Sequence, residues 1–355
     1  MKTPDLVRDI YLSPQATLVA GPMVRYSKLP FRETVRELTA RFNPAQQVVV
    51  YTPMILAREF ARNGVARLSD FTSSSSDSPL LVQFGSANPE DLARAALLVA
   101  PYCDGIGLNC GCPIPEQCRE GVGAALMVQP HVVAAMVRAV KREVDLFVEV
   151  KIRIHTDLAV TRRFARIVEA SGADAICVHG RRKADRSGNV PVSLEGIKAV
   201  RSSVSLPVIA NGDFRSFKQI EKFIDATRAA ESLEKPSQSP EIPVTAGLET
   251  SINGLMSARG VLSNPAMFCP QFETCPWAAV EILWDHIMVS GLPFQLILHH
   301  FVEMFKGRGD LAVLRKDLVS NLTTIDLIDW FDRCFDLKRR GEPGFGERTE
   351  WPILV

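Results

Sequence analysis

Eight short runs rich in β-forming residues recur along the first 260 residues, and longer stretches of helical periodicity separate them. The runs are 17–21, 47–52, 79–85, 104–109, 146–154, 173–180, 206–213 and 251–260. The stretches between them, such as 89–100, 130–143, 158–171 and 216–230, place apolar residues three and four positions apart. Repeated βα units close a parallel sheet, so this alternation predicts an α/β fold of the TIM (β/α)8 barrel type.

The 355-residue chain is longer than the roughly 250 residues of a lone barrel. From about residue 277 the β pattern stops and amphipathic helices follow. We therefore predict a barrel domain over 1–272 and a small C-terminal helical domain over 273–355, which ends in an irregular tail. The segment 231–251 is rich in Pro, Ser and Glu, a composition that favours a solvated insertion before the last strand.

The bulk composition is that of a globular enzyme, with 46% apolar and 23% charged residues. No stretch approaches the ~18 consecutive apolar residues of a membrane span, and the first residues lack the apolar region of a secretory signal. We expect an intracellular protein of the cytoplasm or nucleus, with reduced cysteines and no obligate protein partner. The net charge of +1 argues against a uniformly basic surface but allows a local basic face.

Polar residues and glycines gather where the predicted strands end, which is where barrel enzymes place their active sites. They are Gly21-Pro22-Met23, Gln83, Asn109 to Pro113, Lys151 and Arg153, His179-Gly180-Arg181, Asn211-Gly212-Asp213, and Ala258-Arg259-Gly260. The last three groups predict a phosphate pocket, because backbone amides beside glycine approach an anion closely and Arg259 adds a charge. A plain turn is the alternative for any single glycine.

Lys151 lies inside an apolar strand, where a cation needs an electron-rich partner. The pyrimidine edge of a flavin would supply one, and an ion pair with Glu149 or Asp213 is the alternative. No GxGxxG motif follows a strand, so the sequence offers no Rossmann site for a nicotinamide cofactor, and any NADPH would bind over the flavin itself.

Cys112 lies in the segment LNCGCP, between Gly111 and Pro113, on the loop that leaves the fourth strand. Reduction of an isolated double bond needs a positioned acid, and a thiol of ordinary pKa stays protonated at neutral pH. The alternative is a small buried apolar residue, which is the reading we give to Cys103, Cys110 and Cys118.

The sequence predicts no metal site, because Cys-x-Cys is poor spacing for zinc or an iron–sulfur cluster. His155 is either solvated or in contact with a substrate. His299 and His300 lie on a predicted helix, where structural or RNA-facing roles are favoured.

An ordered set of motifs resembles the tRNA-dihydrouridine synthase family, in particular its eukaryotic 20a/20b branch. The motifs are GPMVRYSKLPFR (21–32), YTPMI (51–55), PLLVQFGSANPEDL (79–92), LNCGCP (108–113), GVGAALM (121–127), KIRIHTDL (151–158), VHGR (178–181), PVIANGD (207–213) and GLMSARGVLSNPAMF (254–268). They span nearly all of the predicted barrel in the family's order, which is far more specific than any single motif.

The resemblance implies reduction of a D-loop uridine of tRNA to 5,6-dihydrouridine, with FMN as cofactor and NADPH or NADH as reductant. By position, Cys112 resembles the proton donor to C5 of uracil, while reduced FMN delivers hydride to C6. The residues that resemble FMN contacts are Pro22, Met23, Val24, Gln83, Lys151, His179, Asn211, Gly212, Asp213, Ala258 and Arg259. Asn109 and Arg153 resemble contacts near the uracil. Independently of the resemblance, basic residues at 306–316 and 338–340 are candidates for contacts to the tRNA backbone, and ordinary solvated helix faces are the alternative for both clusters.

Two positions depart from the family's pattern. Gly107 stands where the family usually has aspartate, and Arg182 stands where threonine commonly follows the HGR motif. A flavoenzyme acting on a free pyrimidine or dihydroorotate shares the barrel, the flavin and the loop cysteine, and remains an alternative. A non-catalytic tRNA-binding chaperone that has kept the fold is a second one, against which the intact Cys112, Lys151 and His179 speak.

Overall fold

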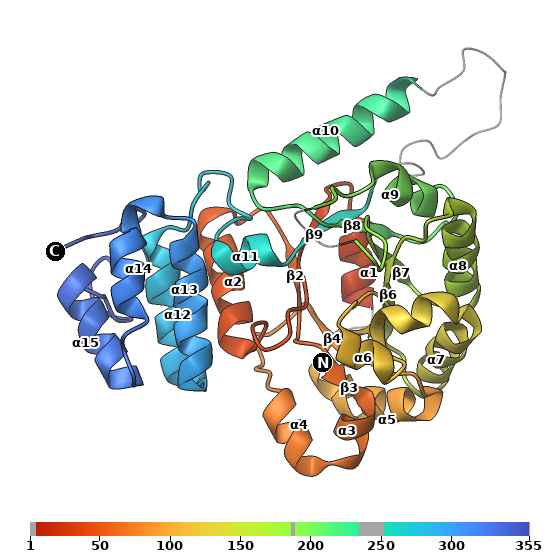
Figure 1. The fold of residues 1–355 in the computed structure, drawn as a ribbon, viewed down its shortest axis with the longest axis horizontal. Coiled ribbons are helices and arrows are strands. Elements are labelled where there is room, and N and C mark those ends of the chain that lie inside the picture. Colours follow the sequence, from red (N-terminus) through yellow and green to blue (C-terminus); the bar gives the residue numbers. More distant parts are fainter. Residues whose placement is uncertain (1–4, 186–188, 234–251, 355) are drawn as a thin grey trace.

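A computed structural model describes residues 5–185, 189–233 and 252–354. Within these residues the strands form one parallel sheet in the order β2-β1-β9-β8-β7-β6-β5-β4-β3, and a further pairing of β2 with β4 closes it into a barrel. The predicted TIM barrel is therefore confirmed (Figure 1). The barrel strands are β1 (Thr17–Ala20), β2 (Val48–Tyr51), β4 (Leu80–Gly85), β5 (Gly105–Asn109), β6 (Phe147–Arg153), β7 (Ala175–His179), β8 (Val208–Asn211) and β9 (Gly254–Ser257). The two-residue strand β3 (Ile55–Leu56) runs beside the end of β4, outside the ring.

Helices cover the outside of the barrel, and the four stretches predicted between strands are all helical. They are α5 (Pro89–Val99), α7 (Pro130–Glu143), α8 (Leu158–Ala170) and α10 (Phe217–Leu233). The other helices of this part are α2 (Leu29–Phe42), α3 (Ala57–Arg62), α4 (Gly64–Asp70), α6 (Pro115–Arg119), α9 (Leu194–Arg201) and α11 (Arg259–Ser263). The start of α5 shows why these segments are helical, because the Asn88 side chain accepts a hydrogen bond from Asp91 N and Pro89 stands at the first helical position.

Helix α10 includes the first residues of the predicted insertion and projects from the barrel in Figure 1. The remainder of that insertion, 234–251, lies outside the described residues. The described chain also has three short 3-10 helices: Ala100–Tyr102, Gly123–Val128 and Gly309–Leu311. Among the described helices, none combines the length and apolarity needed to cross a bilayer.

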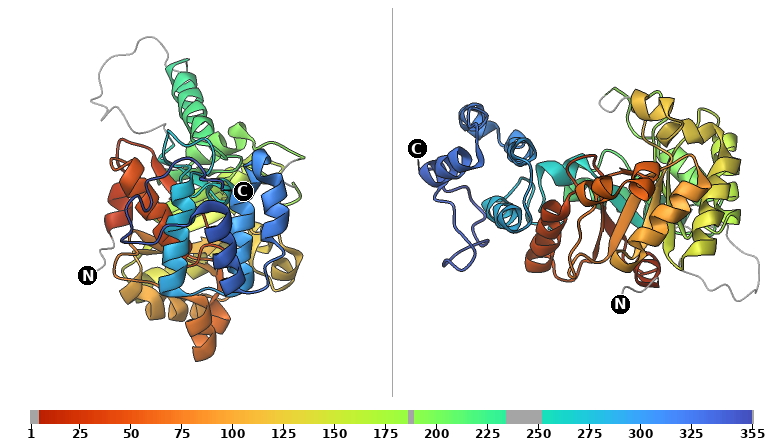
Figure 2. Two further views of the ribbon diagram at one scale, coloured as in Figure 1. Left: turned by 90° about the vertical axis from the view of Figure 1, so that its left-hand side faces the viewer. Right: turned by 90° about the horizontal axis from the view of Figure 1, so that it is seen from below.

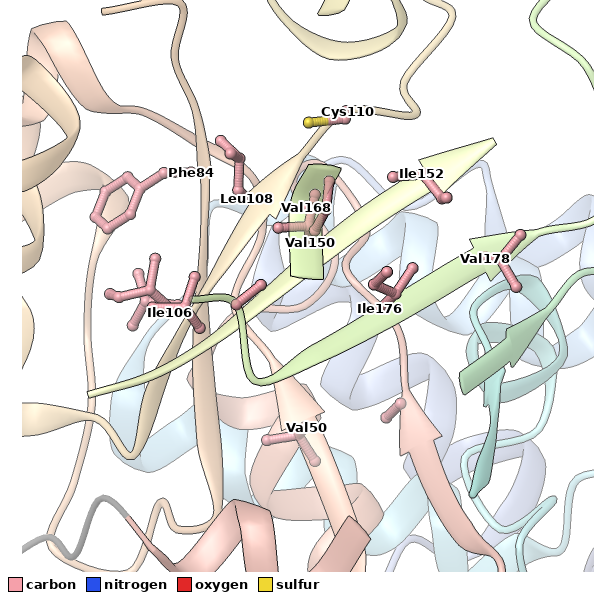
Figure 3. Close-up of a cluster of buried hydrophobic side chains, with 14 of the residues drawn as sticks. Val50, Phe84, Ile106, Leu108, Cys110, Val150, Ile152, Val168, Ile176 and Val178 are labelled. Atoms are coloured by element: carbon pink, nitrogen blue, oxygen red, sulfur yellow. The ribbon is translucent and has the colours of Figure 1, made fainter. Parts of the chain in front are cut away.

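The strands carry two separate sets of buried side chains, because successive residues of a strand point to opposite faces of the sheet. Outward-facing residues such as Val150, Ile152, Ile176 and Val178 belong to the large apolar cluster between the strands and the helices (Figure 3). Residues of the opposite parity fill the barrel interior, and they include Val49, Leu81, Phe147, Cys177, Ile209 and Met256.

Helix α1 (Asp5–Tyr11), which the sequence analysis did not predict, closes the end of the barrel where the strands begin. Its Val7, Ile10 and Tyr11 pack against the inward-facing side chains. The Tyr11 hydroxyl donates to Oε2 of Glu149 at 2.9 Å, and the Tyr51 hydroxyl donates to Oε1 of the same carboxylate. Glu149 is fully buried, so these two hydroxyls satisfy a charge that is otherwise costly to bury.

The helices predicted after residue 277 pack together at one side of the barrel, next to α2 (Figures 1 and 2). They are α12 (Trp277–Ser290), α13 (Phe294–Lys306), α14 (Ala312–Leu318) and α15 (Thr324–Phe335). Their shared core is rich in aromatic rings, and Leu38 of α2 belongs to it. The fully buried Glu281 accepts hydrogen bonds from Trp277 Nε1 at 2.7 Å, from Gly346 N at 2.8 Å, and from Arg348.

A cluster of charged groups joins α12 to α2. The His286 ring bonds to Glu37 through Nε2 at 2.9 Å and faces Glu33 through Nδ1 at 3.4 Å. Arg340 bridges Glu37 of α2 and Asp285 of α12. Burial alone would lower the pKa of His286, but the two carboxylates outweigh it and raise that pKa to about 9. The ring is therefore a cation at neutral pH.

Candidate active site

The alternation of side chains brings the predicted polar residues into the barrel at its carboxyl end. In β6 the inward residues are Phe147, Glu149, Lys151 and Arg153, so the last two reach the mouth while the first two stay in the floor. His179 and Asn211 occupy the corresponding positions at the ends of β7 and β8, where they pair in register. The sequence-predicted site residues of these strands thus face one space.

Lys151 is held by an amide. Its Nζ donates to Asn211 Oδ1 at 2.7 Å, and Asn211 Nδ2 in turn donates to the carbonyl of Met256 at 2.8 Å. Neither carboxylate that the sequence offered as a partner takes this position, since Glu149 bonds to tyrosines and Asp213 to Arg181. Burial lowers the pKa of Lys151.

Beside the mouth, the buried Nη1 of Arg181 lacks a hydrogen-bond partner among the described residues. Two buried nitrogens at the mouth itself also lack partners in the described chain: Nδ1 of His179 and Nε2 of Gln83. Burial, together with the charges of Lys151 and Arg153, lowers the pKa of His179 to about 2. The imidazole is therefore neutral at pH 7. Unpaired buried polar groups are rare in folded proteins, and these two are suited to a polar ligand that enters the mouth.

A cavity of about 100 Å³ opens between the ends of β7, β8 and β9. Its lining residues are His179, Asn211, Gly212, Asp213, Phe214, Arg215, Met256, Ser257, Ala258, Arg259 and Gly260. Gly212 has φ +119°, and a Cβ there would lie 2.4 Å from Cγ1 of Val192. A Cβ on Gly260 would lie 2.6 Å from the carbonyl oxygen of Phe214. Both positions therefore require glycine, and their backbones line the cavity directly.

Asp213 is tied to the loop that follows β7. Arg181 Nη2 donates to both of its carboxylate oxygens, at 2.7 and 2.6 Å. The backbone N–H of Val192 donates to the same carboxylate at 3.1 Å. Asp213 lines the predicted phosphate pocket, and no sequence pattern indicates Arg181 as its partner.

The loop that carries Cys112 is braced from two sides. Asn109 Oδ1 accepts the backbone N–H groups of Gly111 at 3.0 Å and Cys112 at 2.9 Å. Arg153 Nε donates to the carbonyl of Gly111 at 2.6 Å. Gly123 approaches from the other side, so closely that a Cβ there would lie 2.6 Å from the Cys112 carbonyl oxygen. Asn109 and Arg153, predicted near a substrate, thus both contact the Cys112 loop.

The Cys112 thiol is partly exposed, whereas Cys103 and Cys110 are fully buried in the apolar cluster. Figure 3 shows Cys110 among these apolar side chains. Burial raises the pKa of Cys112, although a backbone hydrogen bond from Ile114 and the charges of Arg153 and Lys151 oppose the rise. The group is therefore a thiol at neutral pH, with a proton to give.

The loop after β1 forms another side of the mouth. The N–H of Gly21 donates to the Ser257 carbonyl at 2.7 Å, which joins the ends of β1 and β9. Met23 is buried, and its N–H donates to Ser27 Oγ at 2.9 Å, while Val24 is exposed. Pro22 stands between Gly21 and Met23 and is partly buried.

Three histidines considered in the sequence are placed by the structure. Both ring nitrogens of His155 are engaged, with Thr161 Oγ1 at 3.1 Å and the Met127 carbonyl at 2.8 Å, so this side chain joins helix α8 to the 3-10 helix Gly123–Val128. His300 is fully buried and stacks on Phe31, while His299 is exposed. In the described parts of the chain, no group of three or more His, Cys, Asp or Glu side chains is arranged to hold a metal ion.

The basic clusters of the C-terminal helices are largely engaged within the protein. Lys306 pairs with Glu303 and Arg308 with Asp310. Arg339 pairs with Asp332, and Arg340 joins α2 to α12 as described above. Within the 338–340 cluster, Arg340 links two helices, while Lys338 and Arg339 make surface pairs with Asp336 and Asp332.

The Dus family, described as dihydrouridine synthase, matches residues 18–232, which is more than half of the chain. The chain belongs to the dihydrouridine synthase family. A tRNA-dihydrouridine(20a/20b) synthase (NAD(P)+) of Saccharomyces cerevisiae is 42% identical over 340 residues, covering 94% of this chain and 84% of the relative. The corresponding Schizosaccharomyces pombe protein is 40% identical over 355 residues, covering 98% and 96%. A protein of Mus musculus named as like this synthase is 38% identical over 304 residues, covering 84% and 83%.

The departure at Gly107 has a structural reason in this member of the Dus family. A Cβ at Gly107 would lie 2.5 Å from Cε1 of Tyr51, whose hydroxyl is bonded to Glu149. The Tyr51 ring thus fills the space that a side chain at 107 would take. The buried acid of the barrel floor in this chain is Glu149 of β6.

Proposed function

We propose that this protein reduces a uridine in the D-loop of tRNA to 5,6-dihydrouridine, with FMN as cofactor and NADPH or NADH as reductant. The observation that carries the proposal is the braced, protonated and partly exposed thiol of Cys112 at the mouth of a Dus-family barrel. The names of the relatives give tRNA, positions 20a and 20b, and NAD(P)+ for those proteins.

The residues at the strand ends fit FMN. The cavity between β7, β8 and β9, with its two obligatory glycines and Arg259, suits the phosphate. Lys151 supplies a positive charge, and the unpaired nitrogens of His179 and Gln83 supply hydrogen-bonding groups. Pro22, Met23 and Val24 would border the cofactor on the β1 side. When bound, FMN supplies the hydride that is added at C6 of uracil.

The chain itself supplies the proton. Cys112 holds it on Sγ at neutral pH because the thiol pKa is raised, and gives it to C5 of the uracil ring. Arg153 and Lys151 lower the cost of the thiolate that results, and solvent can restore the proton because the group is partly exposed. Asn109 and Arg153 hold the loop so that the thiol stays in place.

The RNA has to present its uridine to this recessed site. A base inside folded tRNA must swing out at an unstacking cost of a few kcal/mol, which contacts to the RNA backbone offset. We propose that residues 1–272 carry the chemistry and that residues 273–355 hold the RNA beside the mouth. Such an enzyme would act in the cytoplasm or nucleus.

The test uses the full-length protein, FMN, NADPH and an unmodified tRNA transcript. We expect Cys112→Ala to bind FMN like the wild type and to form dihydrouridine at least about 10²-fold more slowly. Cys118→Ala removes another partly exposed thiol, whose Sγ lies 3.6 Å from the Cys112 carbonyl oxygen, and should keep most of the wild-type rate because Cys112 itself remains. A protein that cannot be loaded with FMN, or a Cys112→Ala variant of full activity, would contradict the proposal.

The choice of substrate distinguishes the proposed function from a flavoenzyme that acts on a free pyrimidine or dihydroorotate. Free uracil and dihydroorotate should show no turnover under conditions where tRNA is reduced. Turnover of either molecule, unaffected by added tRNA, would support the alternative instead.

A further inference from the structure

The cavity between β7, β8 and β9 contains a carboxylate where a phosphate is proposed to bind. Asp213 is the only carboxylate among its lining residues in the described chain. A carboxylate and a phosphate repel each other at close range. The site therefore needs something that neutralises Asp213 without filling the cavity.

Arg181 neutralises Asp213 from outside the cavity lining. Its side chain is 2% exposed, and its Nη2 contacts both oxygens of Asp213. Its Nε donates to the carbonyl of Val190, so the guanidinium is fixed by two different segments. Arg181 does not line the cavity, which means that it acts on the cavity through Asp213.

The same contact holds the backbone of the loop. Asp213 has φ +60°, a left-handed conformation that costs a non-glycine residue on the order of 1 kcal/mol. Gly212 beside it has φ +119°, and the N–H of Val192 donates to the Asp213 carboxylate. The unfavourable backbone is thus stabilised by three hydrogen bonds to one side chain, two of them from Arg181.

We infer that Arg181 is a positioning residue for the cofactor phosphate: it neutralises Asp213 and fixes the 211–213 loop in its anion-binding shape. This inference rests on the proposed flavin site. It assigns a role in phosphate binding to a residue that touches neither the proposed cofactor nor the substrate.

FMN and riboflavin differ only in the phosphate, so their affinities separate this role from a general structural one. We measure the dissociation constants of both flavins by quenching of flavin fluorescence in the full-length wild type and its variants. The wild type should bind FMN at least tenfold more tightly than riboflavin. Arg181→Gln should remove most of that preference, while its riboflavin affinity stays within about twofold of the wild type.

The adjacent residue provides a matched control. Arg182 also pairs with an aspartate, Asp185, but its side chain is exposed and does not line the cavity. Arg182→Gln should leave the affinities for both flavins unchanged. Asp213→Asn, introduced into the Arg181→Gln variant, should restore part of the FMN affinity because the uncompensated carboxylate is then gone.

Arg181→Lys is a second variant in case Arg181→Gln does not fold. It keeps the positive charge but has a single donor group, so its preference for FMN over riboflavin should be intermediate. Equal losses for FMN and riboflavin in these variants would overturn the inference and show a structural role only. An unchanged FMN preference would overturn it as well. A wild type that binds neither flavin would instead refute the proposed function, and the inference with it.

Discussion

The side-chain oxygen of Asn109 accepts the backbone N–H of Cys112 at 2.9 Å. The same oxygen accepts the N–H of Gly111, so one amide at the end of β5 sets the course of the loop that carries the thiol. The Asn109 side chain is buried and its nitrogen is also engaged, with Gln83 Oε1 at 3.1 Å. Asn109 therefore fixes the position of the loop that carries the reacting thiol.

Asn109→Ala should slow proton delivery and affect the cofactor site little, because its described contact there is one hydrogen bond to Gln83 Oε1. Loss of the amide leaves two N–H groups of the loop unpaired, and a small displacement of a reacting group can cost up to about 10²-fold in rate. We expect at least a tenfold slower oxidation of the reduced flavin by tRNA in single turnover, with an FMN affinity within about twofold of the wild type.

Asn63 supplies a control with the same bonding pattern, because its side-chain oxygen accepts the N–H groups of Val65 and Ala66 on the surface helix α4. Asn63→Ala should leave the single-turnover rate unchanged. A full rate in Asn109→Ala would show that the brace is dispensable.

The reactivity of Cys112 should follow its raised pKa. Alkylation by iodoacetamide requires the thiolate, so its rate should rise with a midpoint above the ordinary thiol value. Turnover should fall through the same pH range, because the acid that gives the proton is lost. Arg153→Gln removes a charge that favours the thiolate, so it should move the midpoint further upward.

The measurement is made in a Cys118→Ala background, with the modified residue identified by mass spectrometry of peptides. A midpoint at or below the ordinary thiol value would contradict the assignment of Cys112 as an acid that is protonated at neutral pH.

Glu281 should be critical for the stability of the C-terminal helices. Glu281→Gln removes the charge that Arg348, Trp277 and the N–H of Gly346 share. Among the described residues, the partly buried guanidinium then keeps only its hydrogen bonds to Asp336, whose carboxylate lies 3.4 Å from Nη1. We expect a loss of about 2–4 kcal/mol in the free energy of unfolding, measured with urea. Glu303→Gln breaks a more exposed pair with Lys306 and should cost less than about 0.5 kcal/mol. Similar losses in both variants would refute this role of Glu281.

The joint between α2 and α12 should depend on pH through His286. Its pKa is raised from an ordinary value near 6.5 to about 9, so its cationic form stabilises the fold fully below pH 6.5. That contribution, on the order of 3 kcal/mol at most, is lost as the pH rises through about 9. His286→Gln should therefore destabilise the protein strongly at pH 6 and little at pH 10, measured as thermal unfolding. A stability difference that does not change with pH would contradict this role.

Much of the site could be predicted because barrel strands alternate and end at one rim. Lys151, His179 and Asn211 have the right parity and stand at strand ends, which identified them without any knowledge of contacts. The Cys112 loop was evident for a related reason, since it directly follows a buried strand.

The remaining features depend on partners that are distant in the chain. Glu149 bonds to Tyr11 and Tyr51, which are 138 and 98 positions away in the sequence. Because both partners are distant, no local sequence pattern indicates that this acid is buried and hydrogen-bonded inside the barrel. Helix α1 has seven residues, too few to show a clear period. Arg181 was visible beside His179, but its role depends on Asp213, which lies 32 positions further along.

Helix α1 gives the barrel a sealed bottom, with Tyr11 bonded to the acid at its centre. In the proposed reaction, the nicotinamide and the transfer RNA would therefore both reach the flavin from the rim that holds Cys112. The two substrates are too large to bind at this rim together, so the enzyme would have to bind them one after the other. Double-reciprocal plots of initial velocity against the concentration of NADPH, measured at several fixed tRNA concentrations, should then be parallel lines. Converging lines would indicate that both substrates bind at the same time.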